Sequence, residues 1–186
     1  MAKINRRLVA DVLSIVRMLC GFTLIAVAIL AAKNGWSATN DIVKWEFALI
    51  ACATFTFLVQ ERDVGGDESS EYLALMADVL FLVLALMAYG LGRQPWAGVG
   101  TVAFVVYTLS FATAFMGVQW HNKIIYQIGQ IVVQASIVTA TVIPPWQAWS
   151  IYGWEMTLIM VALSALYGTI TGWRHWTEFL LLHQTE

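Results

Sequence analysis

Charged residues are scarce in this chain. Asp, Glu, Lys and Arg together make up 12% of its 186 residues, whereas hydrophobic residues make up 60% and the mean hydropathy is +0.72. A soluble domain contains about a quarter charged residues. The net charge of −2 also excludes the basic surface expected of a nucleic-acid-binding protein. The composition therefore predicts an integral membrane protein.

Cysteine and histidine are also rare, with two and three residues, and this restricts the possible cofactors. The two cysteines, Cys20 and Cys52, both lie in apolar segments and are interpreted as packing residues. No pair among His121, His175 and His183 has the spacing of metal ligands on one helix. We therefore predict no cofactor other than structural lipid. The sequence gives little support to a divalent metal or to a tetrapyrrole held by one axial histidine, and both alternatives stay open.

Long apolar runs dominate the rest of the chain. Because a helix needs about twenty apolar residues to cross a bilayer, we predict an all-α fold, a polytopic transmembrane bundle of about six spans in one domain, residues 1–186. Glycine and proline pairs separate the runs, and Pro144-Pro145 is expected to end the fifth span. The predicted spans are Leu8–Ala32, Lys44–Val59, Tyr72–Leu91, Ala97–Gly117, Ile124–Ile143 and Trp154–Gly172.

Three segments are expected outside these spans: a short N-terminus (1–7), an acidic loop (61–71) and an interfacial tail (173–186). The tail can also continue the sixth helix, since its apolar residues share one face. Lys and Arg near helix ends mark the cytoplasmic side. We expect both termini in the cytoplasm and a bacterial inner (cytoplasmic) membrane. The cytoplasmic side would carry Lys3, Arg6, Arg7, Arg62, Lys123 and Arg174, against Lys33, Lys44 and Arg93 on the other.

Two ionisable residues, Arg17 and Asp78, lie deep inside predicted spans. A lone charge at that depth is unfavourable by about 2.5–3.5 kcal/mol on insertion scales. Both residues lie at similar depth in helices of the same direction, so we predict that they form an intramembrane polar pair. A buried ion pair that fixes helix register is the leading interpretation, and a phosphate or metal site is the alternative. Asp11 and Glu46 are placed near span ends, where water or headgroups reach them.

Two further patterns concern contacts between helices. Amide side chains one turn apart share a face of the fifth span, where they either hydrogen-bond to other helices or line a polar path. Small residues four apart form a ridge on the sixth span, which allows close packing within this chain or against a partner. The amide stripe comprises Gln127, Gln130 and Gln134, and the ridge comprises Ser164, Gly168 and Gly172.

The segment from Asn5 to Met18, NRRLVADVLSIVRM, contains Arg17 and leads into the first apolar run. It resembles the opening of the CDP-alcohol phosphatidyltransferase family, membrane enzymes of similar length with six spans. The family signature is an aspartate, two residues, Asp-Gly, two residues, Ala-Arg, eight residues, Gly, three residues, Asp, three residues and Asp. In that family the aspartates hold divalent metals that bind the diphosphate of the CDP donor, and the last aspartate activates the acceptor hydroxyl.

Asp78 matches the final aspartate of that signature and would be the catalytic residue of an enzyme of this type. Counting back without gaps from Asp78, the other seven positions hold Ala74, Ser70, Glu61, Gln60, Phe57, Thr56 and Ala53, none of which matches. The resemblance thus covers the architecture and lacks the metal ligands. It implies a scaffold derived from this family that no longer catalyses the reaction.

We therefore expect a non-catalytic accessory or structural subunit of a larger membrane complex, surrounded by membrane lipids and bound to partner subunits. One alternative is a divergent phosphatidyltransferase of phospholipid synthesis that uses Asp78. The other is a transporter or channel subunit built around the amide stripe of the fifth span.

Overall fold

The chain folds into helices throughout the part that the computed structural model describes, residues 2–36, 41–63, 68–92, 96–120 and 122–184. The described residues contain no strand, and the predicted all-α class is confirmed. The six helices are α1 (Ala2–Asn34), α2 (Asp41–Asp63), α3 (Glu68–Gly90), α4 (Trp96–Gln119), α5 (Lys123–Tyr152) and α6 (Trp154–Gln184).

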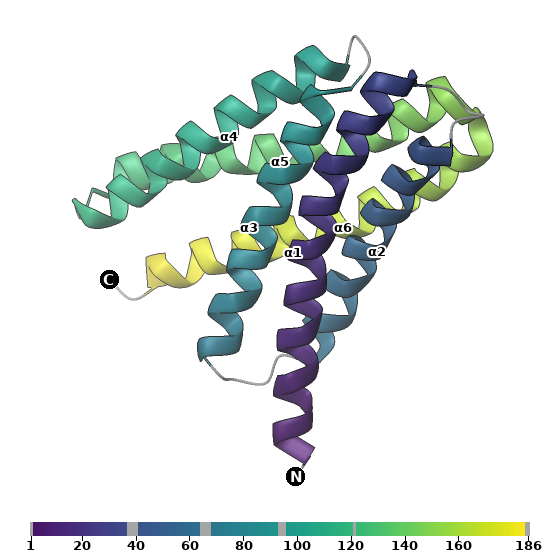
Figure 1. Cartoon of the computed structure of the whole chain (residues 1–186). Coiled ribbons are helices and arrows are strands. Elements are labelled where there is room, and N and C mark those ends of the chain that lie inside the picture. Colours follow the sequence, from purple (N-terminus) through teal and green to yellow (C-terminus); the bar gives the residue numbers. More distant parts are fainter. Residues whose placement is uncertain (1, 37–40, 64–67, 93–95, 121, 185–186) are drawn as a thin grey trace.

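The helices form two layers, α1 to α3 and α4 to α6 (Figure 1). In the first layer α1 packs against both α2 and α3, and in the second α5 packs against both α4 and α6. Figure 1 shows that the helices of the second layer cross those of the first. The layers meet where α3 contacts α4 and α5 and where α2 contacts α6.

Among the described residues, four helices are long and apolar enough to cross a membrane. The qualifying segments are Leu8–Asn34, Asp41–Val59, Ala97–Ala114 and Lys123–Tyr152. The other two helices carry shorter apolar stretches, Met76–Gly90 and Trp154–Ile170. Large apolar side chains lie exposed along the candidate spans, as expected for helices whose outer faces contact lipid.

Several helices extend beyond their predicted ends. The predicted acidic loop 61–71 is largely helical, because α2 runs to Asp63 and α3 begins at Glu68. The tail after residue 172 continues α6 as far as Gln184. Residues 64–67 of the loop, the last two residues of the tail and Arg93 lie outside the described residues.

The prediction that Pro144-Pro145 ends the fifth helix is wrong, since α5 continues through both prolines to Tyr152. Proline removes a backbone donor and usually disfavours a helix interior. Transmembrane helices tolerate it because neighbouring helices re-satisfy the freed backbone groups. Pro144 is itself buried on the core face of α5.

The ends of α5 follow established capping rules. Asn122 is the N-cap, and its side-chain oxygen accepts hydrogen bonds from the backbone N–H of Ile124 (3.1 Å) and Ile125 (3.2 Å). The helix ends at Gly153, whose φ of 80° lies in the region that glycine adopts at low cost. The next helix, α6, starts at the following residue, so α5 and α6 form a tight helical hairpin.

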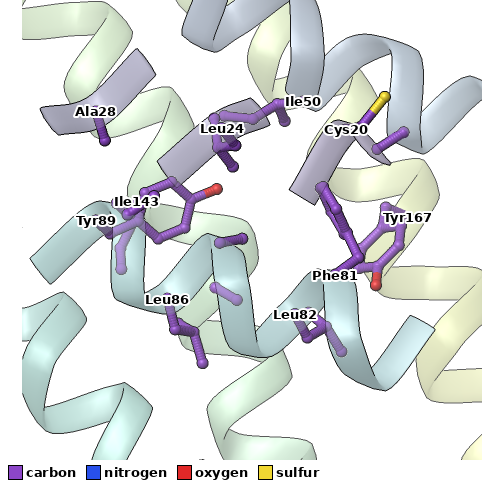
Figure 2. Packing of buried hydrophobic residues seen from close by; sticks show 14 of the residues in the cluster. Cys20, Leu24, Ala28, Ile50, Phe81, Leu82, Leu86, Tyr89, Ile143 and Tyr167 are labelled. Carbon is purple, nitrogen blue, oxygen red and sulfur yellow. The ribbon is translucent and has the colours of Figure 1, made fainter. Parts of the chain in front are cut away.

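The apolar core is continuous between the layers. Figure 2 shows Tyr89 of α3 beside Ile143 of α5, and Phe81 of α3 beside Tyr167 of α6. Leu24 of α1 is fully buried in the same cluster. Because helices from both layers contribute, this cluster is what holds the two layers together.

Glycines allow the closest backbone approaches. A Cβ added at Gly129 of α5 would lie 2.6 Å from the backbone nitrogen of Ala114 in α4. One added at Gly100 of α4 would lie 2.7 Å from the backbone nitrogen of Gly90 in α3. These distances are shorter than van der Waals contact, so the crossings of α4 require the absence of a side chain at these positions.

We expect the substitution Gly129→Ala to destabilise the protein by about 1–3 kcal/mol, because the new methyl group can be accommodated only if α4 moves. The matched control is Gly168→Ala in α6, whose Cβ would lie 3.2 Å from the Cγ2 methyl of Thr141, a milder overlap with a side chain rather than a backbone. Denaturant unfolding in detergent measures both. Equal stabilities for the two variants would contradict the proposed packing of α4 on α5.

Candidate functional site

The most deeply buried charged contact joins Arg17 of α1 to Asp78 of α3. Nη1 of Arg17 donates to Oδ1 of Asp78, and the two side chains are 1% and 10% exposed. These are the two residues whose similar depths in the sequence suggested an intramembrane pair. The contact lies where α1 packs on α3, so it links these two helices.

Aromatic rings surround this pair. The Cζ atom of Arg17 lies 5.1 Å from the centroid of the Phe57 ring, a cation–π distance. Phe57 in turn packs on Tyr167 of α6, with the ring centroids 5.0 Å apart. The phenol of Tyr107 in α4 also interacts electrostatically with Asp78. The pair between α1 and α3 is therefore flanked by the ring of Phe57 on α2, which is itself backed by Tyr167 of α6.

Among the signature positions whose side chains the structure describes, Ala53, Thr56, Phe57 and Ala74, none offers a carboxylate beside Asp78. Ala53 and Ala74 are buried methyl groups. The hydroxyl of Thr56 donates to the carbonyl oxygen of Ala53 at 2.8 Å. No group of three or more His, Cys, Asp or Glu side chains that could hold a metal is found in the searched part of the chain, which leaves out the side chains of Gln60, Glu61 and Ser70.

Removal of Arg17 tests this contact. We expect Arg17→Met to destabilise the fold by about 3–5 kcal/mol, because Asp78 would keep a buried charge without its partner. The double variant Arg17→Met, Asp78→Leu should recover most of that loss. Unfolding by denaturant in detergent measures both effects.

A matched control for this experiment is Lys44→Met. Nζ of Lys44 lies 2.6 Å from Oδ1 of Asp41, but the two side chains are 55% and 82% exposed, so the stability should hardly change. If Arg17→Met were as stable as Lys44→Met, the stabilising role of the buried pair would be contradicted.

The amide stripe of α5 lies beside the core rather than within it. Gln127, Gln130 and Gln134 are all half-buried, while the buried face of α5 carries Gly129, Val133 and Ser136 among others. The stripe therefore borders the interface between helices.

The buried amide of α5 is Gln147, which is 0% exposed. Its Oε1 and Nε2 have no hydrogen-bond partner among the described residues. A Cβ built on Gly92 would lie 3.3 Å from Nε2, so Gln147 lies beside the end of α3. Sequence reasoning missed it because Pro144-Pro145 was taken as the end of the span. The recurrence of buried residues every three or four positions, from Gly129 through Ile143, continues to Gln147 and would have indicated it.

Part of the small-residue ridge of α6 packs against other helices of this chain. Gly168 faces Thr141 of α5, and Ser164 lines a small cavity between the layers. Gly172 lies one turn further along α6, and its surroundings lie outside the described residues.

The prediction that water or headgroups reach Glu46 is wrong. Glu46 lies on α2 and is 0% exposed, because helices of both layers cover this part of α2. Neither of its carboxyl oxygens has a hydrogen-bond partner in the described part of the chain. It interacts electrostatically with Tyr89 of α3 and Tyr152 of α5. Asp11, by contrast, is half-buried in α1.

Two hollows adjoin these elements. A cavity of about 30 Å³ lies between the layers, and its polar lining comes from Thr54, Tyr89, Thr141, Ser164 and Tyr167. This volume is that of about one water molecule. A wider groove of about 430 Å³ follows α4 and α5 on the outer surface and is lined mainly by small and apolar side chains.

Comparison with known proteins adds no relative to these observations. No protein-family model, curated protein or solved structure matches the chain. Functional conclusions about it therefore depend on its own residues.

Proposed function

We propose that this chain is a non-catalytic subunit of a larger membrane protein complex. The observation that carries the proposal is the pairing of Asp78 with Arg17. A carboxylate that is neutralised by a buried guanidinium, itself stacked beside the ring of Phe57, is suited to a packing role. The deepest acid of α3 thus supports a structural role for the bundle.

The lipid-facing surface is consistent with assembly in a membrane. Large apolar side chains cover the outer faces of α1, α4 and α5. We propose that both termini lie in the cytoplasm and that the protein resides in a bacterial inner membrane, as the distribution of Lys and Arg suggests. Its partners would be other membrane-embedded subunits together with lipid.

Purification in a mild detergent tests the proposal. We expect a partner polypeptide to co-purify with this chain in a fixed stoichiometry, measured by native mass spectrometry. Arg17→Met should weaken that association by destabilising the bundle, and Lys44→Met is the matched control. A protein that runs only as a monomer or a self-dimer under these conditions would contradict the proposed role.

The alternative is a divergent phosphatidyltransferase that uses Asp78 as its base. It predicts turnover of CDP-diacylglycerol that depends on a divalent metal and disappears in Asp78→Asn. We expect no such turnover with the wild-type protein, since Asp78 is held by Arg17. Metal-dependent turnover that is lost in Asp78→Asn would replace the subunit proposal by the enzyme.

A further inference from the structure

The burial of Asp78 is explained by an ion pair, whereas the burial of Glu46 is not. Both are buried acids, but Asp78 contacts a guanidinium, whereas both oxygens of Glu46 lack a hydrogen-bond partner among the described residues. The nearest basic residue along α2, Lys44, is exposed and pairs with Asp41. An isolated carboxylate inside an apolar medium is strongly unfavourable, so a buried acid without a counter-charge requires another means of neutralisation.

Within the described ranges of the chain, the ionisable groups that interact with Glu46 supply no positive charge. The interacting ionisable side chains are the phenols of Tyr89 on α3 and Tyr152 on α5. From α1, the residues that join the same core cluster are apolar, among them Leu24, Ala28 and Ala31. Lys33 at the end of α1 and Glu155 at the start of α6 are both exposed.

Side chains able to form hydrogen bonds, in contrast, are available on α5, the helix that carries Tyr152. The hydroxyl of Tyr152 and both amide atoms of Gln147 are buried and have no partner in the described part of the chain. The ring of Tyr152 packs against Phe47, the residue after Glu46, with 5.5 Å between the ring centroids. A neutral carboxylic acid both donates and accepts, which suits an amide and a phenol.

We propose that Glu46 is a proton-binding site inside the bundle, a carboxylic acid that carries an exchangeable proton between the two helix layers. Tyr89 interacts with Glu46 and also lines the water-sized cavity, whose polar lining extends to Tyr167. The ligand of this site is H⁺. The inference goes beyond the subunit proposal and does not depend on it.

The first test compares the wild-type protein with Glu46→Gln, a neutral side chain of the same shape. If the folded protein holds a proton on Glu46 that the unfolded chain releases, the folded state binds more protons and stability must fall as pH rises. For one proton the unfolding equilibrium constant changes by at most about tenfold per pH unit.

We therefore expect the apparent melting temperature of the wild type in detergent to fall, relative to Glu46→Gln, between about pH 5 and about pH 8. The matched control is Asp41→Asn, which removes an exposed acid on the same helix. The melting temperature of the wild type relative to Asp41→Asn should not fall in this way as pH rises. A melting difference that stays constant with pH, or that favours the wild type at high pH, overturns the proposal.

A second readout needs no variant to fold. In the infrared spectrum of the wild type at about pH 8, ordinary Asp and Glu side chains, with pKa values of about 4, are ionised. The proposal predicts a remaining carbonyl band of a neutral carboxyl group. Isotopic labelling of glutamate carboxyl groups shifts this band if it comes from glutamate, and not if it comes from Asp78. A spectrum without a shifted neutral-acid band overturns the proposal.

Discussion

The ion pair between Arg17 and Asp78 is the constraint around which the rest of the bundle is arranged. A guanidinium in the middle of an apolar helix is tolerated only with a partner, and its partner lies 61 residues away on another helix. The requirement ties α1 to α3. The ring of Phe57 on α2 lies beside the guanidinium, and Tyr167 of α6 packs on Phe57 in turn. Removing one partner of such a pair strongly destabilises the fold, because the other charge is left buried without a partner.

The second layer is held by different means. Its helices meet through glycines such as Gly129, where a backbone rather than a side chain forms the contact. Within the helices, hydroxyl groups donate to carbonyl oxygens of their own backbone, as Ser136 does to Val132 at 3.0 Å, and are thereby satisfied without a second helix. Glu46 and Gln147 differ from these hydroxyl groups, since their side-chain polar atoms are buried without hydrogen-bond partners among the described residues.

Much of the fold could be predicted from hydropathy, because the length of an apolar run directly reflects the thickness of a bilayer. The depths of Arg17 and Asp78 within their runs also placed them together. Glu46 was misplaced because it was assigned to the end of its span, whereas α2 begins five residues earlier, at Asp41. Gln147 was missed because it lies beyond the predicted end of the fifth span at Ile143. In a soluble protein the pair Pro144-Pro145 would predict the end of a helix. Here α5 continues through it, because neighbouring helices can satisfy the freed backbone groups, and such contacts cannot be predicted from the sequence alone.

The separation of Arg17 from Asp78 along the chain has a consequence for synthesis. The ribosome completes α1, all of α2 and the first turns of α3 before the acid emerges. During that interval the nascent first helix must retain its cation at the translocon or near the headgroups. Final burial of the cation of α1 is therefore coupled to insertion of the third helix.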